Sequence, residues 1–146
     1  MARYLVTGGA GFVGSHAVLA LLDRGDGVVV LDDLSQGHRA AVPSAAMLVQ
    51  APLADRAELA RVFANWHFDA VLHFAALSLV GDSMKAPMHY LAENLGNSVR
   101  LIEAAIAAGC LRFVLSSTAA LFGKPERVPI DEDCPVAPGN PYGESK

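Results

Sequence analysis

Residues 7–14 read Thr7-Gly8-Gly9-Ala10-Gly11-Phe12-Val13-Gly14, a stretch in which glycine recurs at every third position from Gly8 to Gly14. An apolar run precedes it, and a segment of helical spacing that ends near Gly25 follows it. At a strand-to-helix turn, such glycines permit a tight turn, let backbone N–H groups approach a pyrophosphate, and allow close packing of the helix on the strand. The amino end of the helix then stabilises the phosphate charge. The stretch therefore predicts a dinucleotide-binding loop.

Outward from this loop, apolar runs of strand length alternate with longer segments of helical spacing. Repeated strand–helix units favour a parallel sheet, and uninterrupted apolar runs favour helices on both of its faces. We expect an α/β fold with a doubly wound parallel sheet, in one domain that spans residues 1–146. The expected strands are Arg3–Thr7, Val28–Asp32, Met47–Gln50, Ala70–Phe74 and Arg112–Ser116, and the expected helices are 11–24, one that follows Asp55, and a long one from Pro87 to Gly109.

The composition disfavours several classes of function. The net charge of -4 and the pI near 5.6 give no reason to expect binding to nucleic acid or to an anionic membrane. The amino terminus lacks the features of a signal peptide, and no apolar stretch has the length of a membrane span, so we expect a soluble, cytoplasmic protein. Cys110, Cys134 and the histidines show no ligand spacing, and we expect no metal site.

An acidic pair, Asp32 and Asp33, ends the second expected strand. A carboxylate at this distance beyond Gly14 can accept hydrogen bonds from the ribose hydroxyls of adenosine, and it would repel a 2′-phosphate. NAD is therefore favoured over NADP, and Arg39 is the one nearby residue that argues for NADP. The alternative is that Asp32 only caps the junction between strand and loop.

The last five residues, Tyr142-Gly143-Glu144-Ser145-Lys146, place a phenol and an ammonium one helical turn apart. A phenol, with an ordinary pKa of about 10, needs a neighbouring positive charge to become a usable base near neutral pH. Such a pair is common in isolation, but downstream of a dinucleotide-binding loop it predicts a catalytic base. Between Phe122 and Pro141, several prolines and glycines and an acidic cluster predict a long ordered loop.

The glycine loop and the YxxxK pair together resemble the extended short-chain dehydrogenases, a family with a Rossmann-type NAD-binding fold. Four more segments narrow the resemblance to the UDP-glucose 4-epimerases: Leu31–Arg39, His73–Ala76, Val80–Ser83 and Leu115–Thr118. Family members are much longer, and the part of them that grips the nucleotide sugar follows the YxxxK helix. We therefore expect the C-terminal substrate domain to be absent here and the chain alone to be inactive.

The resemblance implies a role for each matching residue. Tyr142 would be the base on the sugar 4-hydroxyl, Lys146 would lower the phenol's pKa and hold the nicotinamide ribose, and Thr118 would share the proton path. A tightly bound NAD would take a hydride from sugar C4 of UDP-glucose or UDP-galactose and return it to the opposite face, and the full-length protein would be a homodimer. Cofactor contacts are implied for Gly8, Gly11, Phe12, Val13, Gly14, Asp32, Asp33, Ser35, Gln36, Gly37, Leu53, Phe74, Ala75, Ala76, Ser78, Asn94, Ser116, Tyr142 and Lys146.

Two positions depart from the family pattern. Pro52 stands where many relatives have an acid that meets the adenine amine, so adenine recognition would either be weaker or rest on backbone groups around Leu53. Ser78 stands where some epimerases have a lysine near the pyrophosphate, so a hydroxyl would replace a charge.

Other functions stay open. A different sugar-nucleotide epimerase or a 4,6-dehydratase would share the fold and the YxxxK pair, but the dehydratases resemble a pattern with an acidic pair after the Ser/Thr, whereas Ala119 and Ala120 follow Thr118 here. A non-catalytic dinucleotide-binding module is favoured by Pro52 and the short chain. The intact catalytic residues argue against it.

Overall fold

A computed structural model describes all residues, 1–146. The chain forms two compact units. The sheet unit comprises residues 1–76 and 97–116, and the helical unit comprises residues 77–96 and 117–146. The expectation of one domain across residues 1–146 stays a prediction.

The sheet unit is built on five parallel strands in the order β3-β2-β1-β4-β5. The chain order reverses between β1 and β4, which creates a topological switch point at the carboxyl ends of these two strands. The strands are β1 (Arg3–Thr7), β2 (Gly27–Asp32), β3 (Met47–Gln50), β4 (Ala70–His73) and β5 (Phe113–Leu115). They confirm the parallel sheet and the five predicted strand positions, and β5 is shorter than predicted.

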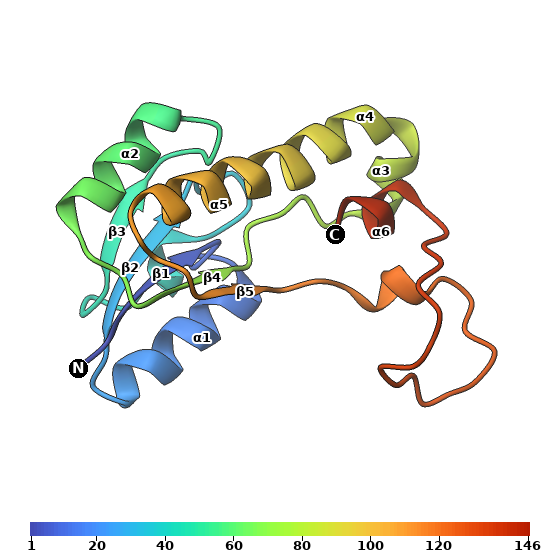
Figure 1. The fold of residues 1–146 in the computed structure, drawn as a ribbon, viewed down its shortest axis with the longest axis horizontal. Coiled ribbons are helices and arrows are strands. Elements are labelled where there is room, and N and C mark those ends of the chain that lie inside the picture. The colour runs from blue at the N-terminus through green and yellow to red at the C-terminus, as the bar shows by residue number, and fades with distance from the viewer. The chain divides into compact units, whose positions relative to one another are not determined.

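Helices cover both faces of this sheet: α1 (Phe12–Asp23) lies on one face, and α2 (Arg56–Asn65) and α5 (Asn97–Ala107) lie on the other (Figure 1). Side chains alternate between the faces of a strand, so neighbouring apolar residues enter different cores. The larger core contains Leu5, Val29, Leu31, Leu59, Val62, Phe68, Val71, Leu101 and Ala105, and the smaller one contains Val6, Val18, Leu21, Val28 and Val30. The predicted doubly wound arrangement is confirmed.

The ends of the helices follow from local chemistry. Gly25 ends α1 with a φ of +80°, and its N–H donates to the Leu22 carbonyl at 2.8 Å while the Asp26 N–H donates to the Leu21 carbonyl at 3.1 Å. These are the two bonds of a Schellman motif, so the predicted glycine cap is confirmed. Asp55 caps α2, because its Oδ1 accepts from the Glu58 N–H at 3.0 Å. A short 3-10 helix, η1 (Arg39–Ala41), follows the loop after β2.

The helical unit differs most from the prediction. Instead of one α-helix from Pro87 to Gly109, the chain forms α4 (Pro87–Tyr90), a π-helical turn η2 (Leu91–Gly96), and then α5. A π-turn is one residue wider than an α-turn, and the apolar spacing of the sequence does not distinguish the two. The unit also contains α3 (Val80–Lys85), which was not predicted, with η3 (Ala119–Phe122) and α6 (Pro141–Ser145). Residues 123–140 form the predicted long loop, without helix or strand.

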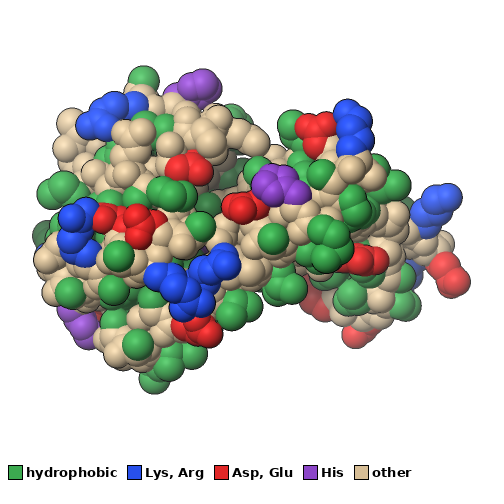
Figure 2. All heavy atoms as spheres, turned by 90° about the horizontal axis from the view of Figure 1, so that it is seen from above, with side chains coloured by type: hydrophobic (Ala, Val, Ile, Leu, Met, Phe, Trp, Pro, Cys, Tyr) green, Lys and Arg blue, Asp and Glu red, His purple; other side chains and the backbone are tan.

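The surface carries charges of both signs. On the face drawn in Figure 2, Lys and Arg side chains lie interspersed with Asp and Glu side chains, without a broad basic area. None of the helices combines the length and the apolar character that crossing a membrane would require.

Candidate cofactor and catalytic site

The backbone of the glycine loop is packed too closely for side chains at two positions. A Cβ on Gly14 would collide with the Gly8 carbonyl, and a Cβ on Gly8 would lie 2.5 Å from the Ala75 nitrogen. Gly8 also has a φ of +70°, which side chains disfavour. The loop therefore holds the amino end of α1 tightly against the carboxyl ends of β1 and β4, at the switch point where such sheets bind ligands.

The first turn of α1 has backbone N–H groups without partners in the helix. Gly11 is the N-cap and provides no side-chain acceptor, so the N–H groups of Phe12 and Val13 lack partners within the helix. The side chains of Phe12 and Val13 are 82% and 57% exposed. This geometry suits a phosphate, because unpaired amides and the helix dipole both favour an anion.

The buried carboxylate of Asp32 is tied to the glycine loop. Its Oδ2 accepts from the Ala10 N–H at 3.0 Å, and its Oδ1 accepts from the Leu34 N–H at 2.9 Å. Asp32 thus anchors both the glycine loop and the turn after β2, so the capping role that the sequence left open is present. A carboxylate has about four acceptor sites, which leaves capacity for ribose hydroxyls.

The loop that follows β2 folds against the glycine loop. A Cβ on Gly37 would lie 2.8 Å from the Ala10 Cβ, and the His38 N–H donates to the Ala10 carbonyl at 3.0 Å. Asp33 is exposed, and its Oδ1 accepts from the N–H and the hydroxyl of Ser35 at 2.8 and 2.6 Å. Gln36 is exposed beside them. The structure brings this predicted set together.

Residues after β4 complete the wall of the glycine loop. The Phe74 N–H donates to the Thr7 carbonyl at 3.0 Å, which places Ala75 against Gly8. Half-buried Ala76 follows. The Ser116 N–H donates to the His73 carbonyl at 3.0 Å and so continues the β4–β5 ladder. Leu53, in contrast, is half-buried and packs against the larger core.

His73 ends β4, where the sequence favours a structural over a catalytic role. His73 is 1% exposed, and its two ring nitrogens lie 2.5 Å from Thr7 Oγ1 and 2.8 Å from Ser98 Oγ. It therefore connects the ends of β1 and β4 to α5 directly below the glycine loop. The available signal was a histidine at the end of an apolar strand, which needs polar partners once it is buried.

In the helical unit, α6 carries Tyr142 and the residues up to Lys146. Asn140 caps this helix by accepting from the Gly143 N–H at 2.8 Å, and Pro141 occupies its first turn. A Cβ on Gly143 would lie 2.8 Å from the Ala120 oxygen, so α6 packs directly on η3. Thr118 caps η3 by accepting from the Ala120 N–H at 3.1 Å, and its own hydroxyl hydrogen can still be donated. The Tyr142 helix and the Thr118 turn are thus neighbours.

The side chain of Asn94 forms hydrogen bonds with other residues of this chain. Its side chain is bound to the backbone of Leu77 and to the Ser145 hydroxyl, and the residue is 3% exposed. Ser78, next to Leu77, is exposed. The predicted cofactor contacts of Asn94 and Ser78 stay predictions, but a tie between Asn94 and α6 was not anticipated.

Lys146 is half-buried at the end of α6. Burial lowers the pKa of its ammonium below the ordinary lysine value, because desolvation disfavours the charged form. The Lys146 carbonyl accepts from the Ser117 hydroxyl at 3.2 Å. The end of α6 is therefore attached to the segment that carries the predicted Thr118.

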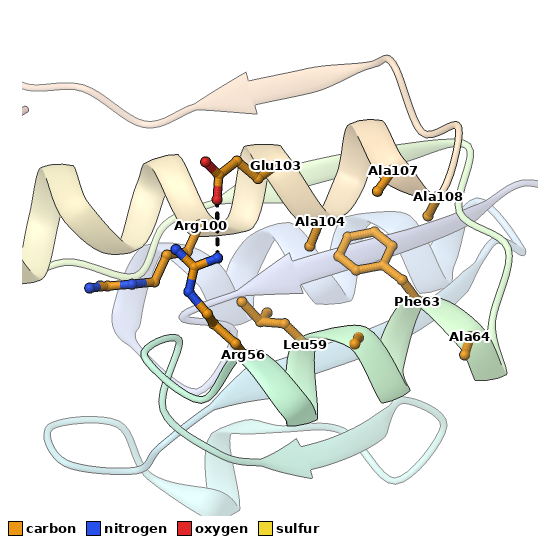
Figure 3. Close-up of a pocket in the computed structure, with 10 residues that line it drawn as sticks. Arg56, Leu59, Phe63, Ala64, Arg100, Glu103, Ala104, Ala107 and Ala108 are labelled. Atoms are coloured by element: carbon orange, nitrogen blue, oxygen red, sulfur yellow. Dashed lines mark hydrogen bonds and ion pairs between the residues drawn. The ribbon is translucent and has the colours of Figure 1, made fainter.

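A groove of about 460 Å³ opens between α2 and α5. Leu59 and Phe63 of α2 point toward Ala104 of α5, and Arg56 forms an ion pair with Glu103 at 3.2 Å (Figure 3). None of the predicted site residues lines it. The predicted site residues therefore do not lie in this groove.

Comparisons with known proteins show the family of this chain. A family model described as the NAD dependent epimerase/dehydratase family matches residues 4–146. The UDP-glucose 4-epimerase of Streptomyces lividans is 49% identical over 145 residues, which cover 99% of this chain and 44% of that protein. The solved UDP-glucose 4-epimerase of Thermus thermophilus in complex with NAD is 39% identical, with a TM-score of 0.94 over 99% of this chain and 47% of that one. The enzyme from Bifidobacterium longum in complex with NAD+ and UDP is 33% identical, with a TM-score of 0.92 over 99% and 45%.

The chain thus spans less than half the length of these relatives. The match nevertheless includes the glycine loop, the Asp32 anchor and the YxxxK helix. Since the family model matches nearly every residue, the chain belongs to the NAD dependent epimerase/dehydratase family.

Proposed function

We propose that residues 1–146 are the cofactor-binding and catalytic part of a UDP-glucose 4-epimerase and act as one domain. One observation carries the proposal. The same chain contains a glycine loop anchored by Asp32 and a helix, capped by Asn140, in which the YxxxK pair begins. The names of the relatives support the substrate, UDP-glucose or UDP-galactose.

The residues of the sheet unit fit a dinucleotide such as NAD. The close packing at Gly8 and Gly14 leaves backbone, not side chains, beside the first turn of α1. The unpaired amides of that turn would bind the pyrophosphate. Asp32 keeps acceptor capacity for the adenosine ribose, and its negative charge would repel a 2′-phosphate. We therefore propose that NAD is tightly bound. It would accept a hydride from sugar C4 and return it.

The residues of the helical unit would move the proton. Tyr142 would take it from the sugar 4-hydroxyl, and the Lys146 ammonium would favour the ionised phenol. Thr118 keeps a hydroxyl hydrogen for donation, so it can hydrogen-bond to the same oxygen. Contacts of the remaining predicted residues with NAD belong to this proposal.

A chimera tests the function. We expect residues 1–146, joined to the remaining residues of the Streptomyces lividans enzyme, to retain NAD and to convert UDP-galactose to UDP-glucose. Nucleotide content of the purified protein and chromatographic separation of the two sugars measure these properties. A chimera that holds NAD but converts neither sugar would contradict the proposal. The purified chain 1–146 serves as the control: we expect weak NAD binding by calorimetry and no turnover, and clear turnover would refute that part.

The same assay distinguishes the dehydratase alternative. In the structure, Ala119 and Ala120 occupy the first positions of η3 directly after Thr118, so no acid is available there to remove water. Formation of a 4-keto-6-deoxy sugar by the chimera would favour the dehydratase.

An exposed apolar stripe on α5 supports a homodimer. Val99, Ile102 and Ile106 lie on one helical face and are 46%, 37% and 59% exposed. We expect Ile106→Arg to convert a dimeric chimera into monomers in sedimentation experiments, because a charge would enter the apolar contact. Leu19→Arg is the matched control, since Leu19 is 45% exposed on α1, across the sheet. Retention of the dimer by Ile106→Arg would argue against this surface.

We also propose a cytoplasmic location. Both cysteines, Cys110 and Cys134, are buried and free, which is usual for proteins of a reducing compartment.

A further inference from the structure

The amide of Asn94 can adopt only one orientation. Its Oδ1 accepts from the Leu77 N–H at 2.8 Å, and its Nδ2 donates to the Leu77 carbonyl at 3.0 Å. The reversed amide would place its NH2 group against an N–H and its oxygen against a carbonyl. The backbone of Leu77 therefore determines that Nδ2, a donor, also faces Ser145.

The hydrogen bonds of Ser145 follow from this orientation. Its Oγ accepts from Asn94 Nδ2 at 2.8 Å, so its own hydrogen is free to be donated to the Tyr142 carbonyl, also at 2.8 Å. Asn94 is 3% exposed and Ser145 is 6% exposed, which leaves little access for a water that could replace either group. A buried donor without a partner is costly, so the pair resists separation.

The position of Ser145 on α6 determines what its bond to Asn94 can fix. With about 100° of rotation per residue, Ser145 lies about 60° from Tyr142 on one side of the helix axis. A bond to Ser145 therefore fixes rotation about the axis without occupying the face that Tyr142 and Lys146 share.

We propose that Ser145 is a positioning residue: its hydroxyl, held by Asn94 in the π-helical turn, fixes the rotation of α6 and thereby the directions of the Tyr142 and Lys146 side chains. We call this hydrogen bond between Asn94 and Ser145 the latch. Its importance for catalysis rests on the proposed epimerase function. Its effect on α6 does not depend on activity. π-Helical turns often occur at functional sites, and here the turn carries the residue that holds the latch.

The structural effect can be measured on the chain 1–146. The sequence has three lysines, Lys85, Lys124 and Lys146, so ¹³C-methylated lysines give few NMR signals to assign. In Ser145→Ala we expect the pKa of Lys146 to rise toward the ordinary lysine value, because α6 no longer holds the ammonium in its half-buried place. Ser145→Thr, which keeps the hydroxyl, should behave like the parent.

Ser83→Ala is the matched control. Ser83 is buried in the same unit, and its hydroxyl also donates to the carbonyl three residues earlier, that of Val80 at 2.7 Å, but it has no bond to Asn94. It should leave the Lys146 titration unchanged. An unchanged Lys146 titration in Ser145→Ala, or an equal change in Ser83→Ala, would overturn the latch.

The catalytic effect is measured in the chimera, at a temperature where melting curves show each variant folded. We expect Ser145→Ala to lower kcat for UDP-galactose about tenfold with little change in KM, because the reacting groups are misplaced while the sugar site is intact. Ser145→Thr should restore kcat. A loss confined to KM, or no loss, contradicts a positioning role.

A second variant covers the case in which Ser145→Ala does not fold. Asn94→Asp keeps an acceptor for the Leu77 N–H but gives Ser145 no donor, so it should lower kcat in the same way. An inactive parent chimera would refute the epimerase function, and the lysine titration would still decide whether Ser145 positions α6.

Discussion

Replacing Tyr142 with phenylalanine is expected to lower the kcat of the chimera for UDP-galactose about a thousandfold, within the range measured for loss of a general base. In the proposed mechanism, the Tyr142 phenol is the base that takes the proton of the sugar hydroxyl, and Lys146 only favours its ionised form. The variant keeps the aromatic ring. The Asn140 bond that caps α6 and the bond from the Ser145 hydroxyl to the Tyr142 carbonyl do not use the phenolic oxygen. The bound NAD content should therefore stay at the parent level, and nucleotide release from denatured protein measures it.

Tyr90→Phe is the matched control for the lost phenol. The Tyr90 hydroxyl donates to the Leu79 carbonyl at 2.8 Å in the interior of the helical unit. Its loss should lower the melting temperature, because a neutral hydrogen bond contributes about 1 kcal/mol to folding. The kcat should stay within about twofold of the parent value. If Tyr142→Phe retained more than a tenth of the parent kcat, another group would have to be the base.

The sheet could be predicted because its signals are local. Uninterrupted apolar runs, glycines every third position and an acidic strand end each specify their own segment, and the pattern of burial follows from alternation along each strand. The π-helical turn at Leu91–Gly96 could not be predicted, since apolar spacing does not reveal one additional residue in a turn.

The sequence predicted which residues would form the site and their order along the chain. It did not predict the contacts among them. Asp32 was expected to meet ribose, but its bonds to Ala10 and Leu34 depend on the path of two loops. Ser145 lies between two motif residues and has no motif of its own. Its tie to Asn94 joins positions 51 residues apart, which local pattern does not encode.

Replacing Asp32 with asparagine is expected to weaken NAD binding by the chimera at least about a hundredfold, although the side chains have the same shape. Both Asp32 oxygens accept backbone N–H groups, whereas asparagine has one acceptor oxygen. Its NH2 group must then face the N–H of Ala10 or of Leu34. A buried donor without an acceptor costs about 1–3 kcal/mol, so the loop moves to relieve the conflict and the binding surface is no longer preformed. Loss of the proposed charge-assisted bond to ribose would weaken NAD binding further.

Calorimetry on the chimera stripped of nucleotide measures this affinity. Asp26→Asn is the matched control, because Asp26 Oδ1 accepts the Ala2 N–H at 3.1 Å near the amino ends of β1 and β2, at the opposite end of the sheet. It should reduce stability and leave the NAD affinity unchanged. Parent-like affinity in Asp32→Asn would mean that the carboxylate neither shapes the loop nor binds ribose. The preference for NAD over NADP would then have to come from residues other than Asp32. The Asp32 charge would no longer argue against NADP, which Arg39, the nearby cation, favours.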